Sequence, residues 1–360
     1  MRITIDATSA LLRSAGVKGY TYHWLRALRQ QAGSSEEIRA FPLLKDWVNL
    51  DHEHSALALA PTVARLAALH GANVLGSSVL DLLLGGTSVF HAGNLVRQAP
   101  GKARLTATIH DLTSWIMPEV HTESTLRADR TFEERILKRA DGLIAVSENT
   151  RQDAIRLIGI KPERIRTIHS GVPEQYFDAK PSTRAKSYVL FVGTVEPRKN
   201  LDTLLDAWRA LKQDLREHFD LVVAGPQGWN SDATMARIRR ETTYLGYVPE
   251  AEMPGLVAGA SLFVYPSLYE GFGFPLVQAM AANVAVLVSR TSCLPEIAGD
   301  GAAFVDPLSL SDMTAQLTRL LESPEKRSSL AGLGRARAER YRWERCAQES
   351  LTFFREIAGS

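Results

Sequence analysis

Short apolar runs alternate with longer amphipathic segments along this chain. Runs rich in Val, Ile and Leu are typical of buried strands, whereas apolar residues that recur every three or four positions are typical of helices. Regular alternation of the two indicates β-α-β units, so the predicted fold class is α/β with doubly wound parallel sheets. The predicted strands are residues 2–5, 88–91, 105–109, 142–146, 165–168, 188–192, 221–224, 261–265 and 284–288, and the predicted helices 21–30, 133–139, 150–157, 201–211, 276–282, 313–321 and 324–339.

A stretch rich in glycine, proline and small polar residues interrupts this alternation at 171–185. Because 360 residues exceed the size at which one core stops growing, we expect two domains that meet there. The predicted domains are 1–173 and 187–342, with 174–186 as the linker. The amphipathic pattern of 343–357 predicts a helix, and we expect 343–360 to pack back on the first domain.

Composition narrows the class of protein. Apolar residues make up 45% and charged residues 23%, which is typical of globular chains, and a formal net charge of +2 argues against a nucleic-acid partner. Two distant cysteines predict neither a disulfide framework nor a metal site, and they favour a cytoplasmic location. The start MRITIDAT alternates like a strand and not like a signal peptide, so we expect the mature chain to begin there.

Residues 54–84 are rich in Ala and Leu, with Arg65 and Asp81 as their only clearly charged side chains. Core helices are one interpretation, and an apolar docking surface for a lipid-linked substrate or a membrane is the other. The chain has no run of ~18 apolar residues, so a membrane contact would be peripheral.

Ligands of parallel α/β sheets bind at the carboxyl ends of strands. In the first half, the loop around Gly16 and Gly19 leads into a helix whose amides suit a phosphate or a hydroxylated ligand. His110 and Asp111 follow a predicted strand. Asp111 suits a turn or a helix cap, whereas His110 is placed to hydrogen-bond a substrate.

In the second half, Gly193 follows a strand, and Arg198 and Lys199 precede a helix N-terminus, where the helix dipole disfavours cations. A bound anion would remove that conflict, and a guanidinium beside an ammonium suits a diphosphate. The alternative is a solvated charged loop.

The segment 269–279 places Glu270 before Gly271 and Gly273, and Pro275 at a predicted helix start. The glycines allow close approach of a ligand, so Glu270 can accept sugar hydroxyls while the helix amides donate to phosphate. Gln278, one turn into the helix, can reach the same ligand. The chain has no Asp-x-Asp, so we expect no metal to hold a nucleotide diphosphate.

In their order and spacing, these motifs resemble the family-4 retaining glycosyltransferases with the GT-B fold, two Rossmann-like domains that face a central cleft. The strongest matches are 191–200, 245–249, 266–275 and 108–112, and they span nearly the whole chain. The resemblance implies that the first domain binds the acceptor and the second a nucleotide sugar, with no cofactor.

The resemblance also implies roles for individual residues. Arg198 and Lys199 bind the donor diphosphate, Glu270 binds hydroxyls of the transferred sugar, and His110 lies over that sugar from the opposite domain. The other implied donor contacts are Gly16, Gly193, Thr194, Tyr247, Val248, Gly271, Phe272, Gly273, Phe274 and Gln278.

Two positions depart from the family pattern. Many members have an arginine where this chain has Thr194, and a second glutamate, which typically binds the ribose, where it has Gln278. The amide keeps one acceptor but loses the charge, so we expect donor affinity to fall by on the order of 1 kcal/mol.

The form Glu-Pro-Arg-Lys-Asn at 196–200 looks most like bacterial surface-polysaccharide mannosyltransferases, including those of lipopolysaccharide. The predicted reaction is therefore retaining transfer from GDP-mannose to a saccharide or lipid-linked acceptor, in the cytoplasm or at the inner face of its membrane. UDP-sugars and dTDP-rhamnose remain alternative donors. A nucleotide-sugar epimerase and a catalytically silent sugar-nucleotide-binding partner remain alternative functions.

Overall fold

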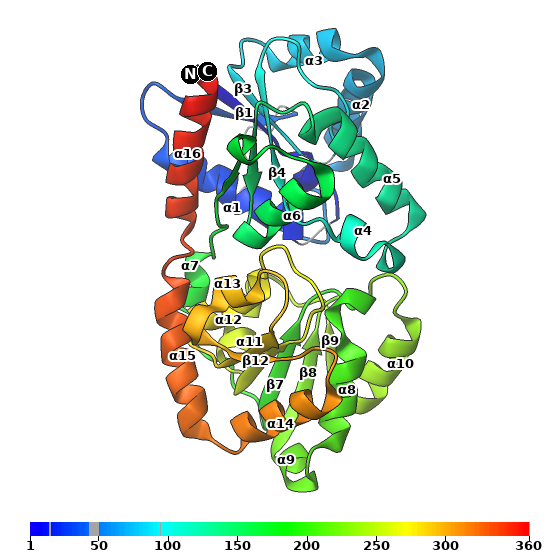
Figure 1. Cartoon of the computed structure of the whole chain (residues 1–360), viewed down its shortest axis with the longest axis vertical. Helices are drawn as coiled ribbons and strands as arrows, with labels where there is room; N and C mark the ends of the chain where they lie inside the picture. Colours follow the sequence, from blue (N-terminus) through cyan, green and yellow to red (C-terminus); the bar gives the residue numbers. More distant parts are fainter. Residues whose placement is uncertain (14–15, 43–49, 94, 360) are drawn as a thin grey trace. The chain divides into compact units, whose positions relative to one another are not determined.

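A computed structural model describes residues 1–13, 16–42, 50–93 and 95–359. These residues form two compact units (Figure 1): one comprises 1–171 with 343–360, and the other 172–342. Residues 14 and 15 of the predicted glycine loop lie outside the described residues.

A parallel six-stranded sheet forms the centre of the first unit, in the order β2-β1-β3-β4-β5-β6. The strands are β1 (Arg2–Asp6), β2 (Glu37–Phe41), β3 (Val89–Ala92), β4 (Arg104–Ile109), β5 (Gly142–Ala145) and β6 (Ile165–Thr167). The sequence pattern misses β2, because this edge strand carries charged residues and is buried only at Ala40 and Phe41. Edge strands need no continuous apolar run.

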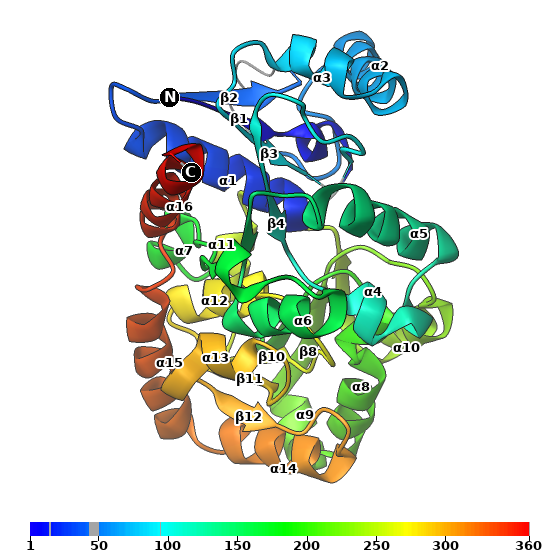
Figure 2. The same ribbon diagram turned by 45° about the horizontal axis from the view of Figure 1, so that its top comes forward.

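Helices cover this sheet and include the C-terminal segment of the chain. They are α1 (Gly16–Gln31), α2 (Leu59–Leu75), α3 (Ser77–Leu84), α4 (Thr113–Ile116), α5 (Glu123–Phe132), α6 (Glu148–Ile158) and α16 (Trp343–Gly359). Helix α16 lies beside α1 in Figures 1 and 2, and the Trp24 indole of α1 donates to Ser350 Oγ of α16 at 3.0 Å. The segment 343–359 is therefore part of the first unit.

The second unit has its own parallel sheet, in the order β12-β11-β10-β7-β8-β9. The strands are β7 (Ser187–Val192), β8 (Phe219–Ala224), β9 (Thr243–Gly246), β10 (Leu262–Tyr265), β11 (Val286–Ser289) and β12 (Ala303–Val305). The chain moves outward from β7 to β9 and then returns to β10 on the other side of β7, so the strand order reverses between β7 and β10. The sequence pattern misses β9 and β12, which are short and partly exposed.

The helices of this unit are α7 (Glu174–Phe177), α8 (Leu201–Ala210), α9 (Gln213–His218), α10 (Asp232–Glu241), α11 (Met253–Ala258), α12 (Phe274–Ala281), α13 (Leu294–Ala298), α14 (Leu310–Leu321) and α15 (Pro324–Ala338). The predicted linker 174–186 begins with α7, whose Tyr176 and Phe177 are buried. Arg335 of α15 donates to the Phe177 carbonyl at 2.7 Å, so this segment packs within the second unit. The glycine and proline content around this segment predicted a linker. Because Tyr176 and Phe177 are buried, α7 is instead part of the second unit.

Candidate functional site

The loops after β7 and β10 meet where the strand order of the second sheet reverses. In open α/β sheets such a switch point is where ligands bind. The loop after β7 carries Arg198 and Lys199, and the loop after β10 carries Glu270. The topology therefore brings together three residues that the sequence analysis selected separately.

Two features shape the backbone of these loops. One is the close contact between Gly225 and Gly193, and the other is the left-handed backbone conformation of Asn200. A Cβ on Gly225, after β8, would lie 2.0 Å from the Gly193 carbonyl oxygen, so only glycine fits there. Asn200 has a φ of 56°, and its amide donates to the carbonyls of Pro266 and Pro307 at 3.1 and 2.8 Å. Asn200 thus ties the loop after β7 to the loop after β10.

Four charged side chains form a buried cluster at this point. Arg198 Nη1 lies 2.8 Å from Glu270 Oε2, and Arg198 Nη2 lies 2.6 Å from Glu196 Oε1. Lys199 Nζ lies 2.6 Å from Glu270 Oε1 and donates to the Tyr265 hydroxyl at 2.9 Å. The exposed fraction of these four charged side chains is at most 14%. We call Glu196, Arg198, Lys199 and Glu270 the four-charge cluster.

This pairing corrects two sequence-based interpretations of the Arg198 loop. The two cations are not bare, because Glu196 and Glu270 balance them, and they are not in a solvated loop, because they are buried. Two cations and two carboxylates have a formal net charge of zero. The sequence analysis missed Glu196, although its place two residues before Arg198 allows a carboxylate–guanidinium pair.

Opposing effects determine the protonation of the cluster. Burial favours the neutral form of Glu270, but the charges of Arg198 and Lys199 outweigh it and lower its pKa to about 2. Burial, and then the charge of Arg198, lower the pKa of Lys199, while Glu270 and Glu196 oppose that shift. Glu270 is therefore ionised at neutral pH and can accept hydrogen bonds from hydroxyl groups.

The backbone around Glu270 is held by the loop after β11. The Glu270 amide donates to Ser292 Oγ at 3.1 Å, and Ser292 has a φ of 54°, which is uncommon for serine. Gly273 has a φ of 82°, and a Cβ there would lie 2.9 Å from the Leu294 side chain. Helix α12 then begins at Phe274, so Pro275 is its second residue.

The remaining predicted donor contacts have different environments. Phe272 is buried and packs edge-on against the Tyr341 ring at 5.7 Å, so its side chain belongs to the core and only its backbone can face a ligand. Tyr247 is exposed after β9, beside half-buried Val248.

Thr194 is half-buried and packs at Gly228, where a Cβ would lie 2.7 Å from the Thr194 methyl group. Gln278 is half-buried, and its side chain has no hydrogen-bond partner among the described residues.

In the first unit, His110 lies at the carboxyl end of β4 and is half-buried. The Tyr20 ring meets its imidazole edge-on at 4.7 Å. Burial lowers the pKa of His110 to about 4, against the opposing charge of Asp111, so the ring is neutral at pH 7. Asp111 accepts from the Thr113 amide at 3.0 Å, which is the turn role expected for it.

Neutral hydrogen-bonding groups continue inward from His110. The Tyr20 hydroxyl lies 3.4 Å from Thr108 Oγ1, which lies 3.0 Å from His91 Nε2. Gly16 is exposed as the first residue of α1. Among the described residues, no group of three or more His, Cys, Asp or Glu side chains is placed to hold a metal ion.

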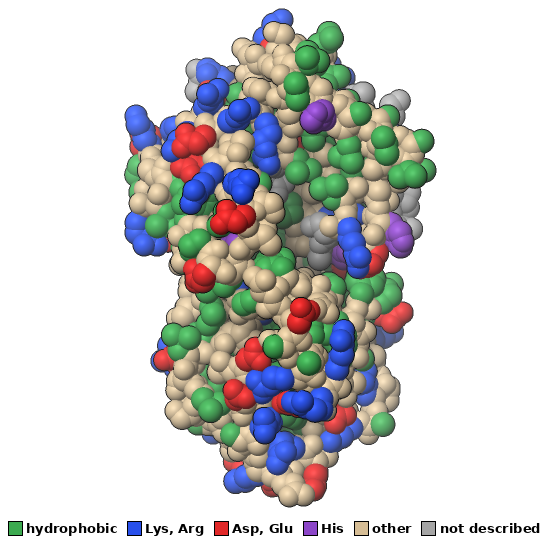
Figure 3. Space-filling view, turned by 90° about the vertical axis from the view of Figure 1, so that its right-hand side faces the viewer, with side chains coloured by type: hydrophobic (Ala, Val, Ile, Leu, Met, Phe, Trp, Pro, Cys, Tyr) green, Lys and Arg blue, Asp and Glu red, His purple; other side chains and the backbone are tan. Residues whose placement is uncertain are grey.

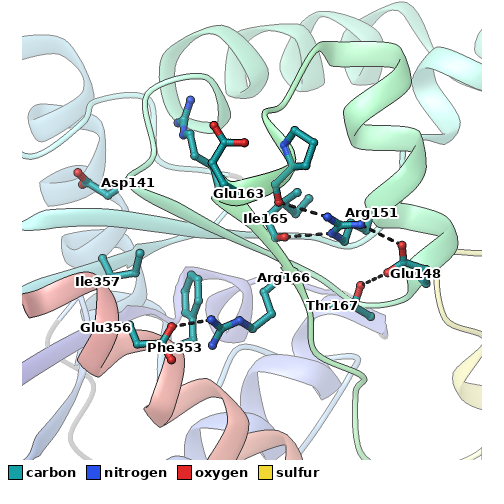
Figure 4. A pocket seen from close by; sticks show the side chains of 12 residues that line it. Asp141, Glu148, Arg151, Glu163, Ile165, Arg166, Thr167, Phe353, Glu356 and Ile357 are labelled. Atoms are coloured by element: carbon teal, nitrogen blue, oxygen red, sulfur yellow. Dashed lines mark hydrogen bonds and ion pairs between the residues drawn. The ribbon is translucent and has the colours of Figure 1, made fainter. Parts of the chain in front are cut away.

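A hollow of about 390 Å³ lies elsewhere in the first unit, beside β6 and α16 (Figure 4). Two of its arginines, Arg151 and Arg166, pair with other residues that line it. Arg166 pairs with Glu356 at 2.5 Å, and Arg151 donates to the Ile165 carbonyl at 3.1 Å and pairs with Glu148 at 3.0 Å. None of the predicted site residues lines it.

Residues 54–84 contain both buried and exposed apolar side chains. Leu69, Ala72, Leu80 and Leu84 of α2 and α3 are buried in the core of the first unit. Figure 3 shows hydrophobic side chains gathered on the outer surface of this region. The exposed members on α2 and α3 are Leu59, Val63, Val74, Leu75 and Leu82, which are 56–81% exposed. We call these five residues the apolar face. Among the described residues, no helix is long and apolar enough to cross a membrane.

Comparison with known proteins gives matches along most of the chain. The family model described as "Glycosyl transferases group 1" matches residues 174–337, and that described as "Glycosyltransferase Family 4" matches residues 18–176. The first matched segment contains the four-charge cluster, and the second contains His110.

Individual relatives agree with these models. The "O-antigen chain mannosyltransferase B" of Escherichia coli is 32% identical over 70% of this chain and 70% of its own length. The "Serotype-specific mannosyltransferase WbdA" of Escherichia coli is 26% identical over 62% of this chain, but the match spans only 30% of that protein. The structure of sucrose-phosphate synthase from Thermosynechococcus elongatus has a TM-score of 0.74 and 19% identity over 100% of both chains, which shows a shared fold.

Proposed function

Because this chain belongs to the group 1 glycosyltransferases and has their GT-B fold, we propose that it transfers mannose from GDP-mannose to a hydroxyl of a saccharide or lipid-linked acceptor. The four-charge cluster carries this proposal. Arg198 and Lys199, which we propose bind the diphosphate, lie beside Glu270, which we propose binds the sugar, at the switch point of the second sheet. The mannosyltransferase names of two relatives favour mannose and a role in surface-polysaccharide synthesis.

In the proposed complex, the donor binds to Arg198 and Lys199 while both are already paired with carboxylates of the cluster. Its diphosphate contacts Arg198 and Lys199, and its sugar hydroxyls donate to Glu270. The carboxylate exchanges part of its pairing with the two cations for hydroxyl donors, while the cations turn toward phosphate oxygens. Charge-assisted hydrogen bonds replace ion pairs, so the change costs little net free energy.

The proposed chemistry is retaining and uses no metal. The bond between the sugar and the phosphate oxygen breaks, and its electron pair remains on the leaving diphosphate. The acceptor hydroxyl bonds to the same face of the sugar carbon, and its proton passes to the leaving phosphate. Arg198, Lys199 and the amides at the start of α12 stabilise the charge that develops there, which is usually the largest single contribution of a protein.

The first experiment identifies the donor. GDP-mannose, UDP-glucose and dTDP-rhamnose are compared for thermal stabilisation of the protein and for transfer to lipid extracts, with the anomeric configuration of the product determined by NMR. We expect stabilisation and retained configuration with GDP-mannose, because a ligand that binds only the folded state raises its stability. Turnover of the donor without any acceptor would instead indicate an epimerase, and binding without transfer would indicate a silent partner.

We also propose that the protein works at the cytoplasmic face of a membrane and contacts it through the apolar face. Exposed apolar side chains in one patch are typical of interaction sites. Asp81, the only acidic residue between 54 and 84, accepts from the amides of Gly101 and Lys102 at 2.9 and 3.3 Å and is thereby held at that loop. Arg65, the only Lys or Arg in this segment, is half-buried, and its Nη1 donates to the Pro61 carbonyl at 3.2 Å. A bilayer surface would therefore meet mainly the apolar side chains of the two helices.

Vesicle flotation tests this contact. We expect the wild type to float with phosphatidylglycerol vesicles, and Leu59→Ser combined with Leu82→Ser to remain unbound. Leu308→Ser is the matched control, because Leu308 is 80% exposed and belongs to the second unit, not to the apolar face. Equal flotation of all three proteins would exclude the apolar face as the contact.

A further inference from the structure

Glu196 is a buried carboxylate with a single side-chain partner. It is 5% exposed, its Oε1 lies 2.6 Å from Arg198 Nη2, and its Oε2 is buried without a hydrogen-bond partner among the described residues. An unsatisfied buried acceptor is costly, and structural carboxylates normally use both oxygens. Asp6 is an example in this chain, since its two oxygens accept from the amides of Thr8 and Gly93.

The single contact of Glu196 therefore indicates that this side chain acts on Arg198 and does not mainly stabilise the loop. Arg198 is held from both sides of its guanidinium group. Nη1 donates to the Tyr269 carbonyl at 2.7 Å and pairs with Glu270, while Nη2 pairs with Glu196. Two contacts on different nitrogens determine the plane of the guanidinium group.

Binding of the donor weakens one of these two supports. If Glu270 turns to the sugar hydroxyls, as the proposed function requires, Arg198 loses part of its pairing on the Nη1 side. Glu196 does not face that competition, because it pairs with the other nitrogen. Together with the Tyr269 carbonyl on Nη1, it can therefore keep Arg198 in one orientation throughout the reaction.

We propose that Glu196 is a positioning residue, which orients Arg198 toward the leaving diphosphate and offsets its charge so that the nucleoside diphosphate product is released. This inference rests on the proposed function. Without the Glu196 carboxylate the cluster would carry a formal charge of +1 and would hold the product more tightly. With it, the formal charge is zero before the diphosphate binds.

Two substitutions separate the positioning effect from the charge effect. Glu196→Gln keeps an oxygen that accepts from Arg198 Nη2 but removes the charge, whereas Glu196→Ala removes both. We expect Glu196→Ala to lower kcat about 30-fold with donor KM changed less than three-fold, because the contact acts mainly in the transition state. We expect Glu196→Gln to recover kcat to within about five-fold of wild type and to bind GDP about five-fold more tightly.

Glu241→Gln is the matched control. Glu241 also has a buried unpartnered Oε2 and pairs with Arg240 at 2.7 Å, but it lies at the end of α10, before β9. We expect its kinetics to equal those of the wild type. GDP is titrated by calorimetry, and UDP replaces it if the wild type uses a UDP-sugar.

The outcomes distinguish this inference from the proposed function. Wild-type protein that transfers no sugar contradicts the proposed function. Wild-type protein that transfers sugar while Glu196→Ala keeps its kcat overturns the positioning role. Equal losses of kcat in the Ala and Gln variants, with unchanged GDP affinity, would show that Glu196 serves only the structure of the loop.

Discussion

The two units use the same architecture, but the side chains gathered around Arg198 in the second unit and those gathered around His110 in the first differ in charge. In the second unit, two cations and two carboxylates meet within 2.6–2.8 Å of one another. In the first unit, His110, Tyr20, Thr108 and His91 form a neutral group of rings and hydroxyls. Both sets are largely buried, so exposure does not explain the difference.

The difference indicates which ligand each sheet suits. A buried ion cluster costs free energy to desolvate and is retained where a charged ligand exchanges partners with it. Neutral donors and acceptors suit a polyhydroxylated ligand without charge. A nucleotide sugar has an anionic part and a saccharide acceptor has none, so the two units agree with the proposed division between donor and acceptor.

The largest expected effect comes from removing a charge of the second unit. Lys199→Met deletes the ammonium group but keeps most of the side-chain volume. We expect the rate of transfer to fall by roughly 10²–10³-fold, which is typical for loss of one group that stabilises a developing anion. The measurement is kcat with saturating donor. Lys212→Met, at an exposed lysine paired with Glu322, is the control and should change nothing.

If Lys199→Met folds and transfers sugar at the wild-type rate, the four-charge cluster is a structural feature and the comparison between the units fails. Circular dichroism and the melting temperature establish that the variant is folded. A rise in donor KM alone, with constant kcat, would show that Lys199 contributes only binding that is equal in the ground state and the transition state.

The second prediction concerns stability and pH. A carboxylate whose pKa is lowered on folding stabilises the protein above its unfolded pKa of about 4.5, and that contribution is lost as pH falls toward about 2. We expect Glu270→Gln to lower the free energy of unfolding by about 3 kcal/mol at pH 7, because each pKa unit corresponds to about 1.4 kcal/mol. The deficit should shrink below pH 4.5. Urea unfolding at pH 7, 5 and 3.5 measures it, and a deficit independent of pH would contradict the pairing.

Sequence patterns predict the fold well where strands are buried on both sides. Strands β7 and β10 read as apolar runs because helices cover both faces of a parallel sheet. The edge strand β2 and the short β9 and β12 lack such runs and were missed. The predicted site residues Arg198, Lys199 and Glu270 meet because β7 and β10 are neighbours, a strand order that the sequence analysis did not predict.

The pairing within the cluster was not predictable in the same way. It depends on side-chain directions in two loops that are distant in sequence, and neither loop signals the other by its spacing. Glu196 stands before a proline in a charged turn, where a glutamate most often faces solvent. Only its 5% exposure and its contact with Arg198 distinguish it.

The third prediction tests the neutral group of the first unit. His110→Phe keeps a ring against Tyr20 but loses the ring nitrogens, which we expect to hydrogen-bond a sugar hydroxyl. We expect kcat/KM to fall about ten-fold, which corresponds to about 1.4 kcal/mol and lies at the upper end of what one hydrogen bond contributes. Burial lowers the pKa of His110 to about 4, so the wild-type rate should show no inflection near pH 6.5. A wild-type rate that falls as pH rises through 6.5, with the His110→Phe rate flat, would show that His110 acts as a cation.

The smallest expected effect is a gain at Gln278. Its half-buried side chain has no hydrogen-bond partner among the described residues, so it is available to a ligand. Gln278→Glu supplies a charged acceptor for the ribose hydroxyls, and a charge-assisted bond exceeds a neutral one by on the order of 1 kcal/mol. We expect donor KM to fall about five-fold with kcat unchanged, in steady-state assays. A rise in KM would mean that the Gln278 amide donates to the base or to a phosphate. The groups of the second unit that bind the anionic part of the donor would then include a residue one turn into α12.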